Sequence, residues 1–133
     1  MSDGLMQVEL VAADRLVWSG RAKMVIARTA EGDVGILPGH APMLALMVDG
    51  VVDVTTEDNE TWIAAVDSGF LSVARNFISI LAEHAEMSHD IDLEKARLDL
   101  ERCKSEGAGD DEALAQAESA WAEARVRAAE KAS

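Results

Sequence analysis

The sequence feature that most constrains the fold is a change of pattern near Glu86. Before this point, short segments alternate polar and apolar residues and are rich in β-branched side chains, which is typical of half-buried strands. The expected strands are residues 7–10, 21–26, 51–55, 61–64, 71–73 and 77–81. Because the segments between them are too short for crossover helices, we expect antiparallel pairing. Many short strands at this spacing predict a β-sandwich or a barrel, and we assign a β-sandwich.

Turn-forming residues separate the expected strands. We expect turns at residues 19–20, which are Ser and Gly, and at residues 75–76, which are Arg and Asn, because Gly, Asn and Ser favour turn conformations. In the second expected strand, alternation predicts that one face is buried. The residues on that face would be Ala22, Met24 and Ile26.

After Glu86 the composition shifts to Ala, Glu, Arg and Leu, which predicts helices. Apolar residues spaced three or four apart mark one face of a first helix: Leu93, Ala96, Leu100 and Cys103. Gly107 and Gly109 should end this helix, and Asp110 or Asp111 can cap a second one. The apolar stripe of the second helix is mostly alanine: Leu114, Ala117, Trp121, Ala124 and Ala128.

Two helices joined by a short glycine turn predict an antiparallel hairpin, with Glu123 and Arg127 as an i,i+4 ion pair on its second helix. Residues 1–87 are therefore assigned to the sandwich and residues 88–133 to the hairpin. Because alanine buries little apolar area, the hairpin gains little from its own packing. Two alternatives stay open: a hairpin that detaches from the sandwich, and a permanent helical pair.

The chain has 133 residues and a formal net charge of −13. A nucleic-acid-binding surface needs clustered basic residues, so that class of function is disfavoured, and basic protein partners suit the chain better than anionic membranes. No apolar run approaches the length of a membrane span, so any link to a membrane is expected through a partner. The single cysteine, Cys103, excludes an intrachain disulfide and is interpreted as a small apolar helix residue.

The histidines His40, His84 and His89 have spacings that match no metal motif, and there is no second cysteine to help bind a metal. Neither a P-loop nor a nucleophile motif is present. The sequence therefore predicts no catalytic site, no metal and no required cofactor. Two alternative functions remain to be weighed: a free-standing β-sandwich module that binds a peptide or small ligand, and a small enzyme that uses His40 or His84.

Residues 31–44 hold three glycines and both prolines of the chain, Pro38 and Pro42. Glycine can take positive φ, whereas proline fixes φ and removes a backbone donor. This segment therefore predicts a shaped, irregular surface embedded among strands, as expected for a docking loop.

The run Gly-Ile-Leu-Pro-Gly-His-Ala-Pro at residues 35–42 resembles the signature of the epsilon subunit of F-type ATP synthases. Further motifs agree in order: VWSG at 17–20, AVDSGFL at 65–71, ILAE at 80–83 and IDLEKA at 91–96. Ser68 stands where a glycine is more usual in the family. The resemblance implies an N-terminal β-sandwich followed by a helical hairpin, which is also what the residue patterns predict.

The resemblance also implies a function, that of a non-catalytic rotor subunit at the cytoplasmic face of the bacterial plasma membrane. The sandwich would join the gamma shaft to the membrane ring of c subunits. The hairpin, when extended, would contact the catalytic alpha/beta head and oppose ATP hydrolysis. The residues implied for docking on gamma and the ring are Glu31, Asp33, Gly35, Pro38, Gly39, His40 and Pro42. Those implied for the brake are Arg125, Arg127 and Lys131.

Some members of this family bind ATP through Ile or Leu, Asp, two variable residues, Arg and Ala at the start of the first helix. Here Asp92 and Ala96 match, Lys95 replaces the arginine, and Arg125 corresponds to a basic ligand on the second helix. Lysine lacks the bidentate fork of arginine, and Trp121 stands where ATP-binding members carry a basic residue. We therefore expect weak or undetectable binding of ATP as a regulatory ligand. The alternative is an N-cap role for Asp92 and a solvent-facing Lys95.

Overall fold

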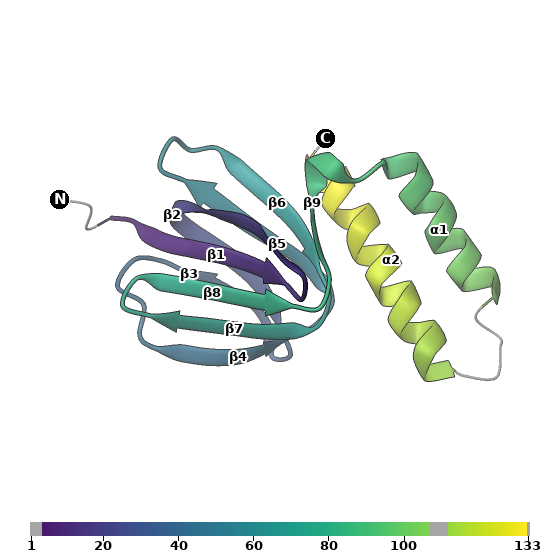
Figure 1. Ribbon diagram of the computed structural model, residues 1–133, viewed down its shortest axis with the longest axis horizontal. Coiled ribbons are helices and arrows are strands. Elements are labelled where there is room, and N and C mark those ends of the chain that lie inside the picture. Colours follow the sequence, from purple (N-terminus) through teal and green to yellow (C-terminus); the bar gives the residue numbers. More distant parts are fainter. Residues whose placement is uncertain (1–3, 107–111, 133) are drawn as a thin grey trace.

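Alternating sequence and turn residues produce nine strands in the first part of the chain, followed by a 3₁₀ turn and two helices (Figure 1). The computed structural model describes residues 4–106 and 112–132, and only the backbone at 105–106 and 112–117. The strands are β1 (Met6–Ala12), β2 (Arg15–Thr29), β3 (Gly32–Ile36), β4 (Met43–Met47), β5 (Gly50–Thr56), β6 (Thr61–Val66), β7 (Gly69–Ala74), β8 (Phe77–Ala82) and β9 (Ala85–Met87). They are followed by η1 (Ser88–Asp90), α1 (Leu93–Glu106) and α2 (Glu112–Ala132).

The strands form two layers that share the long strand β2 (Figure 1). One layer holds β1, β8, β7 and β4, and the other holds β3, β5, β6 and β9 with the second half of β2. The first half of β2 pairs with β1, whereas its second half pairs with β5 and β3. The predicted antiparallel sandwich is confirmed with one exception, since β1 and β8 pair in parallel. Their long separation in sequence allows this pairing without a βαβ crossover.

The predicted buried face of the second expected strand is confirmed at Ala22, which is fully buried, but is wrong at Met24 and Ile26. The register of β2 against β5 shifts between Ala22 and Met24, which is the signature of a bulge. After the bulge Val25 and Ala27 are fully buried, whereas Met24 and Ile26 are only half-buried. One extra residue moves every later side chain to the opposite face.

The turn expected at Ser19 and Gly20 is also wrong, because both residues lie inside β2. A Cβ on Gly20 would approach the Trp18 ring to 2.9 Å, so the glycine makes room for an indole on the same face. The turn expected at Arg75 and Asn76 is present, and both residues have positive φ, 51° and 61°. That combination is typical of a two-residue hairpin turn.

The segment at residues 31–44 is less irregular than expected, because β3 and the first residues of β4 occupy half of it. Residue 31 and residues 37–42 lie outside strands, so the predicted irregular loop is present over 37–42. The expectation is wrong only for the residues in β3 and β4, where strand pairing prevails over the low strand preference of glycine. Gly35 lies within β3 opposite Ile26, where pairing with β2 determines its conformation.

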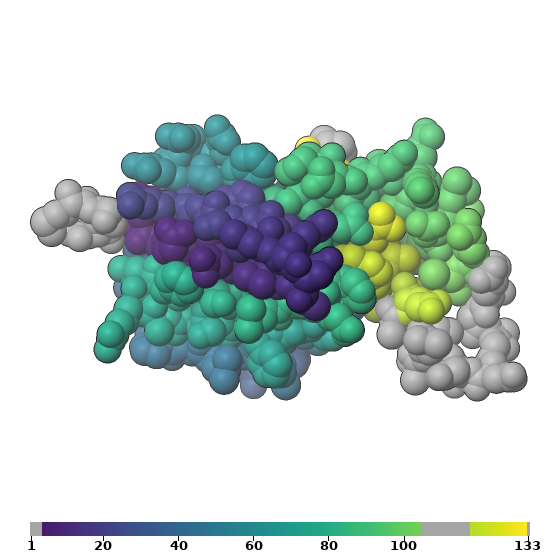
Figure 2. Space-filling model, in the orientation of Figure 1, coloured from purple at the N-terminus to yellow at the C-terminus, as the bar shows by residue number. Residues whose placement is uncertain are grey.

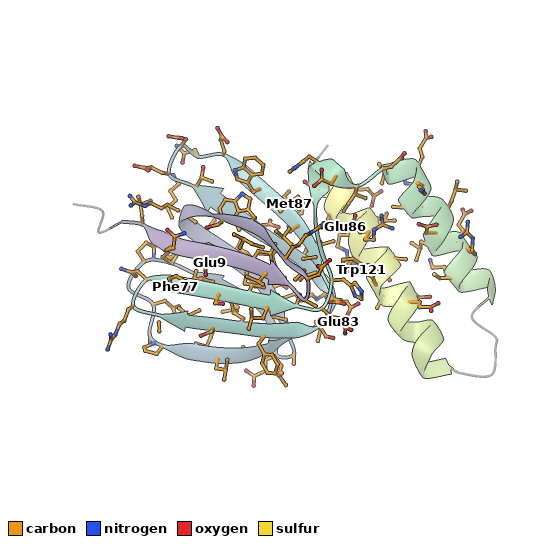
Figure 3. All side chains as sticks on the ribbon, viewed as in Figure 1. Glu9, Phe77, Glu83, Glu86, Met87 and Trp121 are labelled. Carbon is orange, nitrogen blue, oxygen red and sulfur yellow. The ribbon has the colours of Figure 1, made fainter. Side chains whose placement is uncertain are left out.

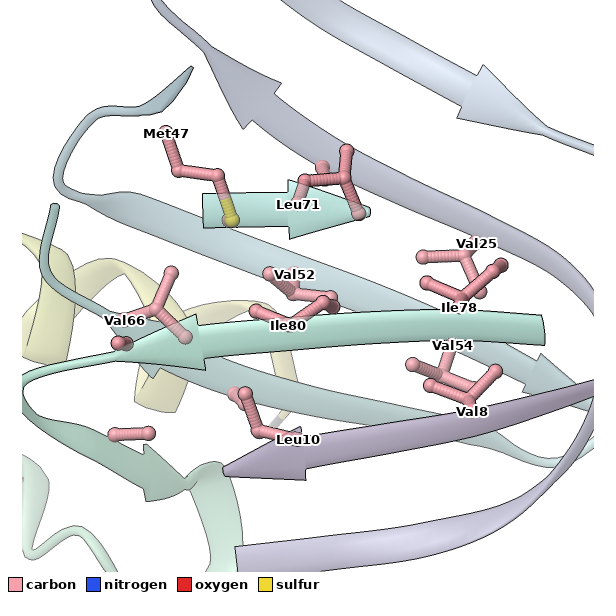
Figure 4. Packing of buried hydrophobic residues seen from close by; sticks show 14 of the residues in the cluster. Val8, Leu10, Val25, Met47, Val52, Val54, Val66, Leu71, Ile78 and Ile80 are labelled. Atoms are coloured by element: carbon pink, nitrogen blue, oxygen red, sulfur yellow. The ribbon is translucent and has the colours of Figure 1, made fainter. Parts of the chain in front are cut away.

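The main core lies between the two layers and consists of aliphatic side chains from nearly every strand (Figure 4). Its largest fully buried members are Met6, Ile36, Leu71, Ile78 and Ile80. Two neighbouring strands of one layer approach closely at the start of β7, where a Cβ on Gly69 would lie 1.9 Å from the carbonyl oxygen of Leu81 in β8. The apolar burial in this core is what stabilises the sandwich.

The two helices pack side by side, and α2 lies between the sandwich and α1 (Figures 1 and 2). A second apolar cluster joins Ile63 and Ala65 of β6 to α2 and α1. The predicted helix faces are confirmed where side chains are described, since Ala96, Ala124 and Ala128 are buried. The predicted break at Gly107 and Gly109 and the cap at Asp110 or Asp111 lie outside the described residues. The side chains of Leu114 and Ala117 are likewise not described.

Candidate functional site

The first predicted docking residues, Glu31 and Asp33, lie at the tip of the turn between β2 and β3. Thr29, the one polar residue buried within the described chain, holds this turn. Its hydroxyl donates to the Gly32 carbonyl (2.8 Å) and accepts from the Glu31 N–H (3.2 Å). Gly32 has a φ of 118°, which side chains rarely adopt. The turn therefore presents both carboxylates to solvent, and each is exposed.

The remaining docking residues lie beyond the other end of β3 or within it. The Gly39 N–H donates to the Asn76 side-chain oxygen (2.7 Å), which ties the loop at residues 37–42 to the turn between β7 and β8. The His40 ring donates to the Ala41 carbonyl (2.7 Å), and His40 is half-buried. Pro38 is half-buried, whereas Gly35, Gly39 and Pro42 are exposed.

The seven predicted docking residues therefore do not form one patch. The turn at residues 31–33 and the loop at residues 37–42 are separated by the length of β3. A five-residue strand spans about 16 Å. The structure thus divides the predicted docking set between two ends of the sandwich.

A third surface, which the sequence patterns did not indicate, lies between these ends on the outer face of β4, β7 and β8. Four large apolar side chains there are 49% to 72% exposed: Leu44, Leu46, Phe70 and Leu81. We call them the outer apolar row. The strand register places Leu46 opposite Phe70 and Phe70 opposite Leu81, so three of them form a continuous line across the sheet. A signal was present in the sequence, since residues 43–47 contain no polar residue where a half-exposed strand should alternate.

The predicted brake residues all lie on α2 and are all engaged in ion pairs. The Arg125 Nε lies 2.9 Å from Glu86 Oε1 without hydrogen-bond geometry. Its Nη2 donates to Glu86 Oε2 (3.5 Å), and its Nη1 donates to Asp99 Oδ2 (3.3 Å). Lys131 lies 2.7 Å from Asp53 of β5. Arg127 pairs with Glu123 of the same helix at 3.2 Å, as the sequence predicts.

Next to these pairs, His84 links the sandwich to α2. Its ring donates to Asp67 Oδ2 (2.6 Å), and its backbone N–H donates to Asp67 Oδ1 (2.8 Å). The hydrogen bond to Asp67 raises the pKa of His84 above its usual value. The ring of Trp121 lies 5.9 Å from the imidazole. Burial, followed by the negative charge of Asp67, raises the pKa of Asp49.

A cleft of about 380 Å³ opens beside His84, where the turn after β8 meets α2. Figure 3 shows Glu83, Glu86 and Trp121 at this junction. A His–Asp pair can orient an imidazole for catalysis, but the residues lining this cleft include no Ser, Thr or Cys that could act as a nucleophile. Among the described residues, no group of three or more His, Cys, Asp or Glu side chains is placed to hold a metal ion.

The predicted ATP-binding residues are only partly brought together. Asp92 Oδ1 accepts the Lys95 N–H at 3.2 Å, which is the N-cap arrangement, and Lys95 itself is exposed. Ala96 is fully buried between the helices. Arg125 lies beside Asp99, and Asp99 is one helical turn after Lys95 on α1. The Arg125 guanidinium is already paired with the carboxylates of Glu86 and Asp99. A phosphate could use Arg125 only by displacing them.

Comparison with known proteins gives consistent matches over most of the chain. Residues 5–88 match the family described as ATP synthase, Delta/Epsilon chain, beta-sandwich domain. The ATP synthase epsilon chain of Streptomyces avermitilis is 53% identical over 102 residues, covering 77% of this chain and 82% of the relative. That of Rhodococcus opacus is 48% identical over 128 residues, covering 96% and 98%.

The fold also occurs in solved structures of low sequence identity. A chain of the Euglena gracilis mitochondrial ATP synthase has a TM-score of 0.81 at 21% identity, over 95% of this chain and 81% of that one. A chain from the central stalk and c-ring of the Tetrahymena thermophila mitochondrial ATP synthase has a TM-score of 0.60 at 17% identity, over 96% and 95%. In the described part of the chain, no helix is long and apolar enough to cross a membrane.

Proposed function

We propose that this chain is the central-stalk subunit that joins the gamma shaft to the membrane c-ring. The proposal follows from the family, because the chain belongs to the ATP synthase epsilon chains. Epsilon chains are non-catalytic accessory subunits, so the chain is not an enzyme in its own right. Because the chain belongs to this family, we interpret it as a rotor subunit and no longer as a free-standing binding module or as an enzyme that uses a histidine. The subunit would sit at the cytoplasmic face of the bacterial plasma membrane, attached through its partners.

The observation that carries this proposal is the outer apolar row. Large apolar side chains gathered on one sheet face mark an interaction surface, because their exposure to water is unfavourable. Leu46, Phe70 and Leu81 are aligned across three strands, which makes a surface suited to a rigid partner. The similar Tetrahymena chain comes from a central stalk and c-ring structure, which supports a stalk protein as that partner. We assign the row to gamma.

The two ends of the sandwich supply the rest of the docking surface. The loop at residues 37–42, with His40, would extend the contact with the shaft foot. The turn that carries Glu31 and Asp33 would face basic residues of the c-ring. Such pairs at an interface rim contribute about 0.2–1 kcal/mol each and weaken with salt. The separation of the two ends by β3 suits a subunit that touches two partners at once.

The helical hairpin would act as a brake. Extended, it would bring Arg125, Arg127 and Lys131 to acidic surfaces of the alpha/beta head and oppose rotation in the hydrolysis direction. When the hairpin is docked on the sandwich, as in this structure, it would not contact the head and would not oppose rotation. ATP would bind the isolated chain weakly or undetectably, because Arg125 is bound by Glu86 and Asp99, and Lys95 offers a single charge.

Leu46→Asp tests the assignment of the outer apolar row. We expect at least a roughly tenfold loss of co-purification with gamma, because a charge would enter the centre of an apolar contact. Leu16→Asp is the matched control, since Leu16 is similarly exposed but lies on β2, away from the row. Both variants should melt like the unmodified chain. If the two substitutions weaken gamma binding equally, the row is not the docking face.

A further inference from the structure

We propose that α2 is held on the sandwich by an electrostatic latch, formed by Arg125 with Glu86 and Asp99 and by Lys131 with Asp53. This inference deepens the braking role and rests on it for its consequence. It concerns how the docked hairpin is kept in place and what would release it.

Over residues 118–132, where the side chains of α2 are described, the helix makes its apolar contact mostly with small side chains. These residues add Ala124, Ala128, Ala129, Val126 and part of Trp121 to the second cluster. An alanine buries a single methyl group, so it contributes far less than the leucines and isoleucines of the main core. The described contact therefore defines where α2 sits, while its alanines contribute only modestly to holding the helix there.

The first part of the latch joins three elements through one guanidinium. Arg125 of α2 contacts Glu86 of β9 at 2.9 Å and Asp99 of α1 at 3.3 Å. The Arg125 side chain is only 20% exposed, so water and salt screen these pairs less than surface pairs. Arginine suits the position because its fork can bind two carboxylates at once. One residue thus holds α2 to the sheet and to α1.

The second part lies near the C-terminal end of α2. Lys131 reaches Asp53 of β5 at 2.7 Å, and the Asp53 side chain is only 15% exposed. Residues 125 and 131 are about 9 Å apart along a helix. Two anchors at this spacing, on strands β9 and β5, fix the orientation of α2 as well as its position.

Release of the hairpin would break the pairs with Glu86 and Asp53 and leave both carboxylates unpaired on an acidic sandwich. Arg125 and Lys131 are the same cations that the proposed function assigns to the acidic head. A carboxylate-rich partner surface would therefore compete directly with the latch. In the docked state Arg125 and Lys131 pair with carboxylates of this chain, and in the extended state they would pair with carboxylates of the partner. The equilibrium between the two states therefore depends on ionic strength and on the partner.

The three tryptophans provide the measurement, in the full-length chain without partners. Trp121 is on α2 against His84, whereas Trp18 and Trp62 contact each other in the sandwich. With ¹⁵N-labelled tryptophan, the Trp121 indole resonance reports docking and the other two report folding. Arg125→Gln should lower the docked-to-released ratio about tenfold, as expected for loss of a half-buried charge pair. Raising NaCl should lower the ratio in the unmodified chain.

Arg127→Gln is the matched control, because Arg127 pairs with Glu123 of its own helix and should change the ratio less than twofold. The charge swap Glu86→Arg with Arg125→Glu should restore docking, which a pure packing defect would not. Equal shifts from Arg125→Gln and Arg127→Gln, or a salt-independent Trp121 resonance, would overturn the latch. If Arg125→Gln disturbs Trp18 and Trp62, Glu86→Gln carries the test instead. Failure of gamma binding would overturn the proposed function and leave this result intact.

Discussion

The two apolar clusters of this protein differ in the residue types that form them. The cluster between the sheets contains Met, Ile, Leu and Val side chains that exclude water almost completely. The cluster beneath α2 is mostly alanine and is bordered by ion pairs. Apolar burial is insensitive to ionic strength, whereas ion pairs respond to salt and to competing charges. We therefore expect salt and competing charges to affect the junction between the sandwich and α2 more than they affect the sandwich itself.

The largest expected effect is in the main core. Ile80→Ala should destabilise the whole sandwich by about 2–5 kcal/mol, because Ile80 is fully buried between the layers and the change leaves a cavity. Urea unfolding followed by tryptophan fluorescence measures the loss. Leu98→Ala, at an exposed position of α1, is the control and should change stability by less than about 0.5 kcal/mol. Similar losses in both variants would contradict the division between firm core and adjustable junction.

A shortened chain that ends at Met87 tests whether the sandwich is independent of the hairpin. We expect a cooperative melt and a loss of about 2 kcal/mol, because removal of α2 exposes Ile63 and part of Val51. Calorimetry of the shortened and full-length chains gives the difference. A shortened chain that lacks a cooperative transition would show that residues 1–87 do not form a domain.

A smaller effect is expected for the buried polar residue of the sandwich. Thr29→Val keeps the side-chain shape but removes the hydroxyl that bonds the Gly32 carbonyl and the Glu31 N–H. We expect a loss of about 1 kcal/mol in urea unfolding, the usual net value of such hydrogen bonds. Unlike loss of the latch, this loss should not depend on salt. A marked dependence on NaCl would mean that charges around the turn, and not the hydroxyl, stabilise it.

The smallest expected effect is a pH dependence from His84. Its pKa is raised by the hydrogen bond to Asp67, so the folded state favours the protonated ring. The resulting stability is fully present below the unfolded pKa of about 6.5 and is lost as pH rises through the folded pKa. Asp49, whose pKa is also raised, acts with the same sign but from about pH 4 upward.

Urea midpoints at pH 6 and pH 8 measure this dependence. The unmodified chain should be slightly more stable at pH 6, and the gain should be small because His84 is exposed. Asp67→Asn should abolish the difference, since a neutral amide no longer favours the charged imidazole. A difference that survives this substitution would have to arise from another group.

Local patterns in the sequence determined the elements whose cause is local. Arg75 and Asn76 form the expected turn with positive φ at both residues, a conformation that asparagine adopts more readily than most side chains. Asp92 caps the first helix through a residue three positions away. Alternation located six strands, and helical spacing located the buried faces of α1 and α2. These features need no knowledge of distant residues, and the family motifs added the expected order of the domains.

Tertiary structure alone decided which distant residues meet. The bulge after Ala22 reversed the buried face of β2, because register depends on the partner strand and not on alternation alone. The outer apolar row exists because β4, β7 and β8 align Leu46, Phe70 and Leu81. Arg125 meets Glu86 across 39 residues and Asp99 across 26. The sequence identified such side chains as charged or apolar, but their partners follow from packing, which brings together residues that no local pattern relates.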